Sequence, residues 1–207
     1  MYQWIETLAL SEGALLRLDY HQERLRQTLI AHGATNMIDL DEALSKLILP
    51  SSGYYKLRII YDVSGVVEIA CDLYSPKIWR SFEVIEATEL LYDYKSTDRH
   101  AFEELKQMSS CDEVIISKGG LITDTTYSNL VFEKGGQWFT PSSYLLAGTQ
   151  RQYLLDKGII KEARITISNL TSFQNFKMIN AMMPFESSHI YPVELIQISD
   201  KSLFPSL

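Results

Sequence analysis

The sequence has few cysteines, no run of basic residues and no evident metal site. Its only cysteines, Cys71 and Cys111, form no CxxC pair, and two thiols do not make a disulfide framework. This usage favours a reducing compartment. The formal net charge of −7 argues against nucleic acid as the main partner, because phosphate contacts need clustered Lys and Arg. No second ligand stands at a useful spacing from His21 or His189, so we expect no metal ion.

The sequence also lacks the segments that bring a protein to a membrane. The N-terminus, Met1–Glu6, has no basic stretch followed by an apolar stretch, so no signal peptide is visible. No apolar run approaches the roughly 20 residues that are needed to span a bilayer. We therefore expect a cytoplasmic protein without a membrane partner.

The residues that are present have the composition of an ordinary globular protein, with 46% hydrophobic and 22% charged residues. A length of 207 residues suits one large domain or two small ones. Strand and turn signals mixed with helix signals predict an α+β fold. We expect an N-terminal α+β domain on an antiparallel sheet over residues 1–93 and a C-terminal domain over residues 94–207, with the hinge near residues 89–97.

Local signals place several elements. Turn residues at Ser11–Gly13 and Asp62–Gly65 separate predicted pairs of strands, and Asp19 is expected to cap the first helix. In the second half, Asp98 is expected to cap another helix, and Arg164–Ile167 is expected to form a strand.

Three features suggest chemistry in combination. Lys95 follows apolar and aromatic residues, and burial lowers the pKa of a lysine so that its amine can attack a carbonyl carbon. Asp124 lies among Thr and Ser residues, and a carboxylate can hold a protonated ring nitrogen. The stretch Gly148–Arg151 begins a predicted helix, whose backbone N–H groups and dipole can bind an anion. An amine, an acid and an anion site are the groups that hold a phosphorylated aldehyde cofactor.

Each feature alone has a simpler explanation. Lysines are mostly exposed, aspartate among Thr and Ser often forms a turn, and every helix has an N-terminus. Arg24 lies inside the first predicted helix, where a solvated arginine is common. Tyr92, Tyr94 and Tyr127 are candidates for lining a site, and core packing explains them equally well. The order and spacing of the features, rather than any single one, favour the cofactor.

These residues give the chain a resemblance to the class IV aminotransferases, the fold-type IV pyridoxal-phosphate enzymes. His21–Leu25 resembles the family's H-x-x-R-L helix motif, Gly120–Asp124 its G-x-[VI]-x-E motif and Leu146–Arg151 its L-x-G-[IV]-x-R motif. Tyr94–Arg99 resembles the segment that carries the cofactor lysine. Asn180–Pro184 is most similar to the N-A-L-M-P stretch of aminodeoxychorismate lyases.

The resemblance implies a two-domain fold with a mixed, barrel-like β structure in the second domain, and pyridoxal 5′-phosphate as the cofactor. It implies that Lys95 is the catalytic residue, which binds the cofactor's aldehyde and moves the α-proton as base and acid. It further implies that Asp124 faces the ring nitrogen, and that Arg24 and the start of the helix at Thr149 hold the phosphate. The cofactor-binding residues that the resemblance implies are Arg24, Lys95, Asp124, Asn129, Thr149, Gln150, Asn180 and Ala181.

The sequence departs from the family's pattern in three respects. Asp124 stands where the family has glutamate, so this carboxylate is one methylene shorter. Gln150 stands where threonine is frequent, which leaves mainly backbone donors for the phosphate. The chain is also short for the family, which affects substrate-recognition loops rather than the cofactor residues.

The resemblance implies a small-molecule amine substrate and a homodimer. Asn180–Pro184 favours aminodeoxychorismate lyase, which converts 4-amino-4-deoxychorismate to 4-aminobenzoate and pyruvate. The alternative is a D-amino-acid or branched-chain amino-acid aminotransferase. A further alternative is a non-catalytic member of the family that acts as a binding module.

Overall fold

The structure, a computed structural model, describes residues 2–203, which form two compact units. The first unit is the chain up to Pro76 together with the short segment Tyr94–Asp98. The second unit is Lys77–Asp93 together with the chain from Arg99 onward. Each unit has its own hydrophobic core, so each is described separately.

The short segment Tyr94–Asp98 belongs to the first unit because it pairs with β1 (Trp4–Ser11). The backbone N–H of Ile5 donates to the carbonyl oxygen of Lys95 over 2.9 Å. The compact units therefore divide the chain after Pro76 and set this segment apart, whereas the sequence predicts one boundary between residues 93 and 94. The sequence of Tyr94–Asp98 does not indicate this pairing, because the partner strand β1 is distant in sequence.

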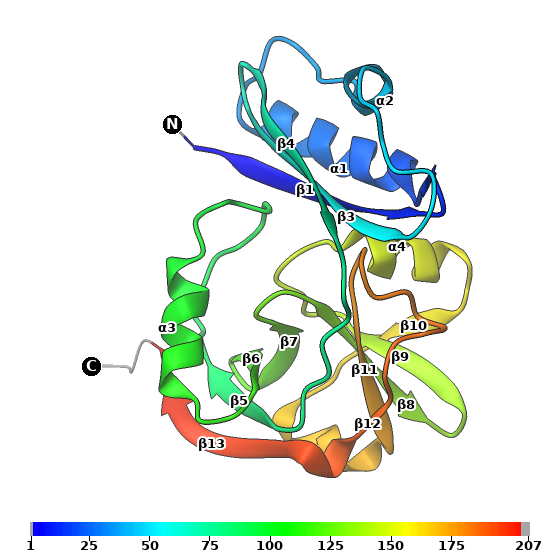
Figure 1. The fold of residues 1–207 in the computed structure, drawn as a ribbon. Coiled ribbons are helices and arrows are strands. Elements are labelled where there is room, and N and C mark those ends of the chain that lie inside the picture. The colour runs from blue at the N-terminus through cyan, green and yellow to red at the C-terminus, as the bar shows by residue number, and fades with distance from the viewer. Residues whose placement is uncertain (1, 204–207) are drawn as a thin grey trace. The chain divides into compact units, whose positions relative to one another are not determined.

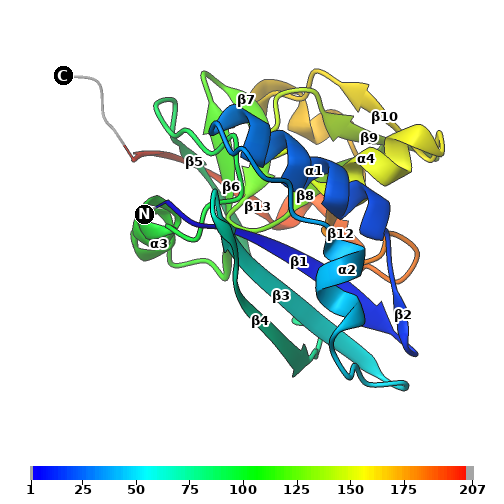
Figure 2. The same cartoon turned by 90° about the horizontal axis from the view of Figure 1, so that it is seen from above.

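The first unit is an antiparallel sheet covered by two helices (Figures 1 and 2). Trp4, Leu8 and Leu57 are buried against Leu25 and Leu29, because alternate residues of a strand point to the same face of the sheet. The strand order is β2-β1-β3-β4. The further elements of this unit are β2 (Ala14–Leu15), α1 (Leu18–Ala31), α2 (Leu40–Ser45), β3 (Tyr54–Asp62) and β4 (Gly65–Leu73).

Helix α1 begins differently from the prediction. Arg17 occupies the N-cap position in the left-handed conformation, with φ 55°, and Asp19 lies in the first turn of the helix. The prediction that Asp19 is the cap is therefore wrong by two positions. Its carboxylate still lies near the positive end of the helix dipole, where a negative charge is favourable. At α3 (His100–Met108) the N-cap residue is Arg99, one position after the predicted Asp98.

The second unit contains two sheets that share one core. Phe82 and Ile115 from one sheet and Phe132 and Phe176 from the other are fully buried in a single cluster. The sheets have the strand orders β10-β9-β8-β11-β12 and β13-β5-β6-β7. The strands are β5 (Phe82–Glu86), β6 (Glu113–Lys118), β7 (Leu121–Thr125), β8 (Asn129–Lys134), β9 (Gln137–Pro141), β10 (Ile160–Ala163), β11 (Asn175–Ile179), β12 (Tyr191–Pro192) and β13 (Ile196–Ser202), and the helices besides α3 are α4 (Thr149–Asp156), η1 (Ile167–Ser172) and η2 (Val193–Leu195).

The strand predicted at Arg164–Ile167 is an error. The strand of this region is β10, at Ile160–Ala163, which pairs in parallel with β9. The chain then turns into η1, whose start is closed by a capping box between Thr166 and Asn169. The predicted range therefore contains only an isolated bridge between Thr166 and Leu121, because the helix η1 begins directly after Thr166.

The predicted α+β fold class is confirmed, with antiparallel pairing in the first unit and mixed pairing in the second. No helix within residues 2–203 is long and apolar enough to cross a membrane.

Candidate functional site

Asp124, near the end of β7, is a buried carboxylate bound by neutral N–H groups. Its Oδ2 accepts hydrogen bonds from the backbone N–H groups of Leu145 (3.1 Å) and Leu146 (3.0 Å). Its Oδ1 accepts from Nδ2 of Asn129 over 2.9 Å. Burial raises the pKa of Asp124 to about 6, although these three donors lower it. A carboxylate has roughly four acceptor positions, so one further donor can bind.

Asn129, the first residue of β8, connects Asp124 to the loop before α4. Its Nδ2 also donates to the carbonyl oxygen of Leu146 over 3.0 Å, so both hydrogens of the amide are used. The amide lies directly against Gly148: a Cβ at this glycine would overlap Asn129 Oδ1 and lie 3.0 Å from Asn129 Cγ. Gly148 has an ordinary extended backbone, with φ −71° and ψ 135°. The glycine is therefore required for space rather than for backbone conformation.

Helix α4 begins at Thr149 without a side-chain cap, because Gly148 is its N-cap residue. The first N–H groups of an α-helix have no acceptor within the helix, so its start can bind an anion. Gln150, in the first turn, is 1% exposed, and its Oε1 has no hydrogen-bond partner among residues 2–203. A buried amide oxygen without a partner is unfavourable, so this position suits a bound polar group.

Asn180 and Ala181 follow β11 and lie at the same end of the sheet. Ile179 of β11 pairs in register with Asn129 of β8. The Asn180 side chain accepts from the backbone N–H of Met182 over 2.8 Å and donates to the carbonyl oxygen of Tyr127 over 3.5 Å. The structure therefore gathers six of the predicted residues within the second unit: Asp124, Asn129, Thr149, Gln150, Asn180 and Ala181.

Arg24 lies in the first unit, on α1, where it forms a two-point ion pair with Glu6 of β1. Its Nε donates to Glu6 Oε1 over 2.9 Å and its Nη2 to Glu6 Oε2 over 2.6 Å. His21 Nδ1 donates to the same Oε2 over 2.6 Å. Glu6 and His21 are fully buried, and the Arg24 side chain is 13% exposed. The guanidinium is thus fixed in orientation before any ligand binds.

Of the two buried members of this group, one is charged and the other is neutral. Burial alone would raise the pKa of Glu6, but the charge of Arg24 and the hydrogen bonds from His21 and Arg24 hold it at about 2. Burial lowers the pKa of His21, although its contact with Glu6 opposes this. Glu6 is therefore ionised and His21 neutral at pH 7.

Lys95, the predicted catalytic residue, is partly buried in the first unit, and its carbonyl oxygen is held by β1 as described above. Arg24 lies in the same unit. The three candidate tyrosines pack against other aromatic rings. Tyr94 contacts His32 (4.7 Å between ring centroids), Tyr92 contacts Phe102 (4.7 Å) and Tyr127 contacts Trp79 (5.3 Å).

Glu6 and the two backbone donors at Leu145 and Leu146 are not among the residues that the sequence predicts. A signal for Glu6 was present, since it alternates with Trp4 and Leu8 on the buried face of a predicted strand, and a charged residue there needs a buried partner. Backbone donors have no side-chain signature, so no pattern could have indicated Leu145 and Leu146.

The second unit can therefore bind a particular kind of molecule. The buried Asp124 carboxylate can accept one more N–H, and a cation would suit it, because its donors among the described residues are neutral. The start of α4 can bind an anion. Pyridoxal phosphate carries both an anionic group and a ring nitrogen that can be protonated, so these residues fit it.

Comparisons with known proteins show which family the chain resembles. The family model described as amino-transferase class IV matches residues 75–187. A protein of Haemophilus influenzae, named only as uncharacterized, is 33% identical over 186 residues, which is 88% of this chain and 98% of that protein.

Solved structures are also similar. A Haemophilus somnus 129PT protein, whose name proposes 4-amino-4-deoxychorismate lyase activity, has a TM-score of 0.80 at 30% identity, over 88% of this chain and 97% of that one. A hypothetical aminotransferase from Mycobacterium tuberculosis, solved with pyridoxal phosphate bound, has a TM-score of 0.70 at 16% identity, over 99% of this chain and 84% of that one. The second likeness shows the fold alone.

Replacing Gly148 with alanine should disrupt the Asp124 network. The added Cβ must displace the Asn129 amide, which loosens its bonds to Asp124 and Leu146, at a cost of about 2 kcal/mol or more. We expect faster hydrogen exchange at the Leu145 and Leu146 amides. The control is Gly136→Ala, where φ is +75° and nothing lies within 4 Å of the new Cβ. If both variants leave these amides equally protected, the close approach at Gly148 is not required.

Asp124→Asn should remove a pH dependence of stability. The native pKa of about 6 lies above the ordinary 3.8, so the native state binds the proton more tightly than the unfolded chain. This stabilisation is complete below about pH 4 and is lost as the pH rises through 6, on the order of 3 kcal/mol. The measurement is the free energy of unfolding in urea at pH 4 and at pH 7. The value for wild type minus the value for the variant should fall by this amount between the two pH values. For Glu6→Gln the same difference should change in the opposite direction and by less, because the native pKa of about 2 lies below the ordinary 4.5 and its stabilisation is lost mainly below pH 4. A constant difference for Asp124→Asn would contradict the raised pKa.

Proposed function

The chain belongs to the class IV aminotransferase family, and we propose that it is a pyridoxal 5′-phosphate enzyme with aminodeoxychorismate lyase activity. The observation that carries the cofactor assignment is the buried Asp124, which has neutral donors and an open acceptor position. A protonated ring nitrogen is the partner that lets such a carboxylate stay ionised.

Pyridoxal phosphate, when bound, supplies an electron sink for negative charge that develops at the carbon beside the substrate's nitrogen. The protein's residues then have distinct roles. Lys95 Nζ would hold the cofactor at its aldehyde carbon and, once the substrate's amine has replaced it there, would take and return a proton. Asp124 keeps the ring nitrogen protonated by accepting its N–H. Both roles are carried over from the family, as a proposal for this chain.

The groups proposed to bind the phosphate are carried over from the family. In the second unit, the backbone at Thr149 and Gln150 offers N–H groups at the start of α4, and Asn180 and Ala181 add polar groups near β8. In the first unit, Arg24 offers its guanidinium, whose orientation Glu6 fixes. Asn129 serves indirectly by holding Asp124. Rigid placement of these groups favours reaction because less freedom is lost when the cofactor and substrate bind.

The lyase assignment rests on two similarities. One is the stretch Asn180–Pro184, and the other is the Haemophilus somnus protein, whose name proposes this activity. The reaction would convert 4-amino-4-deoxychorismate to 4-aminobenzoate and pyruvate. Aminotransferase activity on D- or branched-chain amino acids is the second candidate, because the family model carries that name. We further propose that the protein is a cytoplasmic homodimer.

Lys95→Ala should abolish covalent attachment of the cofactor. Wild-type protein that is loaded with pyridoxal phosphate, freed of excess cofactor and then reduced with borohydride should yield mainly one modified peptide, the one that contains Lys95. An amine at a binding site keeps its reducible bond, whereas the bonds formed by exposed lysines hydrolyse once free cofactor is removed. The measurement is peptide mapping by mass spectrometry. Lys46→Ala, at an exposed lysine of α2, should leave the labelling unchanged. If the label appears on other residues and not on Lys95, the result would support the alternative that the chain is a non-catalytic member of the family, which binds a ligand without converting it.

The product formed from each substrate separates the two candidate activities. With 4-amino-4-deoxychorismate, wild type should release 4-aminobenzoate and pyruvate in equal amounts, and Lys95→Ala should release neither above background. In parallel, D- and branched-chain amino acids with a keto acid acceptor should give little new keto acid. Clear transamination without 4-aminobenzoate would exclude the lyase and leave the aminotransferase.

A further inference from the structure

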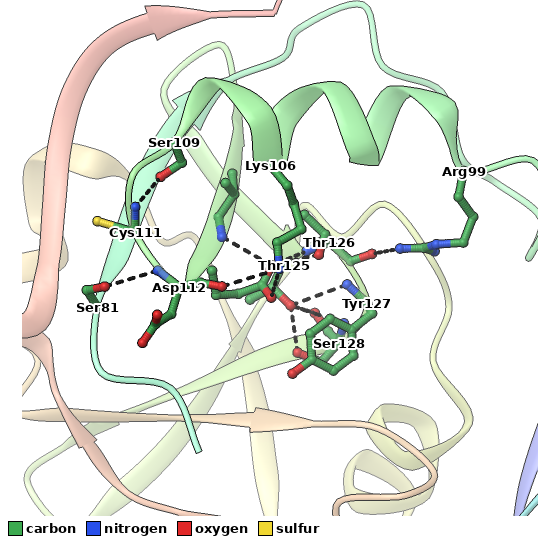
Figure 3. Close-up of polar contacts among 12 residues, drawn as sticks. Ser81, Arg99, Lys106, Ser109, Cys111, Asp112, Thr125, Thr126, Tyr127 and Ser128 are labelled. Atoms are coloured by element: carbon green, nitrogen blue, oxygen red, sulfur yellow. Dashed lines mark hydrogen bonds and ion pairs between the residues drawn. The ribbon is translucent and has the colours of Figure 1, made fainter. Parts of the chain in front are cut away.

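The turn Thr125–Ser128 joins β7 to β8, so Asp124 stands immediately before it and Asn129 immediately after it. The turn is closed by its own hydrogen bonds (Figure 3). The Thr125 N–H donates to the Ser128 carbonyl oxygen over 2.8 Å, and the Ser128 N–H donates to Thr125 Oγ1 over 3.1 Å. Any movement of this turn therefore shifts Asp124 relative to Asn129.

Thr126, in the middle of the turn, is held from two sides. On one side, Glu113 of β6 is fully buried, and its Oε1 accepts from Thr126 Oγ1 over 2.6 Å and from the Thr126 N–H over 3.3 Å. On the other side, Arg99 Nη2 donates to the Thr126 carbonyl oxygen. Figure 3 shows the Arg99 side chain reaching the turn from the start of α3. All three polar groups of Thr126 are thus bonded.

Arg99 is itself held in place by aromatic rings. Its guanidinium lies over the ring of Phe102, 4.5 Å from the ring centroid, and its Nη1 lies 3.5 Å from the hydroxyl of Tyr92. Tyr92 and Phe102 pack edge to face, 4.7 Å apart. Stacking on an aromatic face stabilises a guanidinium and limits its rotation. The donor that reaches Thr126 is therefore fixed in direction.

We propose that Arg99 is a positioning residue that holds the turn Thr125–Ser128, and through it Asp124 and Asn129, in the arrangement that receives the cofactor ring. The role in cofactor binding rests on the proposed function, whereas the effect on the turn does not. Arg99 is suited to the task because it holds a backbone carbonyl, which no substitution in the turn can remove, and because its planar guanidinium presents several donors in fixed directions.

A variant of Lys106 is the control that separates two roles of Arg99, holding the turn Thr125–Ser128 and anchoring α3. Lys106 is the other cation by which α3 joins this network: its Nζ donates to Glu113 Oε2 and to the Asp112 carbonyl oxygen, both over 3.2 Å. None of the Lys106 bonds reaches the turn itself. Lys106→Met should therefore lower stability without loosening residues 125–128, whereas Arg99→Met should loosen them.

The first test uses the cofactor-free protein. Hydrogen exchange at the Thr125 and Ser128 amides should be at least about tenfold faster in Arg99→Met than in wild type. Without the charged donor, local opening of the turn costs less free energy. Arg99→Lys should restore part of the protection, and it serves as the test variant if Arg99→Met does not fold. If Arg99→Met and Lys106→Met change these amides equally, the positioning role is refuted.

The second test adds pyridoxal phosphate. By equilibrium dialysis, Arg99→Met should bind it about tenfold more weakly and Lys106→Met less than about twofold more weakly. The absorption maximum of the bound cofactor should also shift in Arg99→Met alone. If wild type binds no pyridoxal phosphate, the proposed function fails while the exchange experiment still decides the effect on the turn. A loosened turn with unchanged cofactor affinity and spectrum would overturn the positioning role.

Discussion

The candidate site of the second unit depends on one buried carboxylate. Asp124 is 5% exposed, and an ionisable group that leaves water without partners is destabilised by several kcal/mol. The chain supplies its partners from two other places, the backbone of Leu145 and Leu146 and the side chain of Asn129. Satisfying this single side chain therefore fixes the end of β7, the start of β8 and the loop that leads into α4.

The same requirement explains why the loop before α4 ends in glycine. Asn129 must direct both hydrogens of its amide, one to Asp124 and one to the Leu146 carbonyl oxygen, so its Oδ1 is turned toward position 148. Any side chain at that position would occupy the space of this oxygen. Gly148 is also the residue before the first turn of α4, so the packing that orients Asn129 leaves the start of the helix without a side-chain cap. A helix start without a cap is the form that can bind an external anion.

Glu6 and Asp124 show how the partner, rather than burial, decides the charge of a buried carboxyl group. Both are almost fully buried, and burial raises the pKa of each. Glu6 contacts the cation of Arg24, and its pKa falls to about 2, whereas Asp124 has neutral donors in contact, and its pKa rises to about 6. Glu6 is a completed ion pair that orients an arginine. Asp124 accepts hydrogen bonds from neutral groups only among the described residues, so a bound cation would complete it.

Much of the fold follows from local sequence signals, and the contacts of the site do not. The turn at Asp62–Gly65 and the apolar side of α1 sufficed to predict the first sheet and its helix, because these elements depend on neighbours in sequence. Strand β10 was misplaced because its existence depends on parallel pairing with β9, which has no local signal. The order of motifs predicted Asp124 and Asn129 as cofactor-binding residues, and this stays a prediction. Their mutual bond, and the backbone donors that complete it, are properties of the folded chain.

The aspartate at position 124, where the family has glutamate, is accommodated by this same network. The shorter side chain keeps its carboxylate close to β7, where Leu145, Leu146 and Asn129 can all reach it. An added methylene would carry the carboxylate away from the two backbone donors or drive it against the Asn129 amide, which Gly148 already confines. The loss of one methylene thus removes no hydrogen bond in this chain. It makes the position of the carboxylate depend on the loop before α4, so a single arrangement of the backbone sets both Asp124 and the start of this helix.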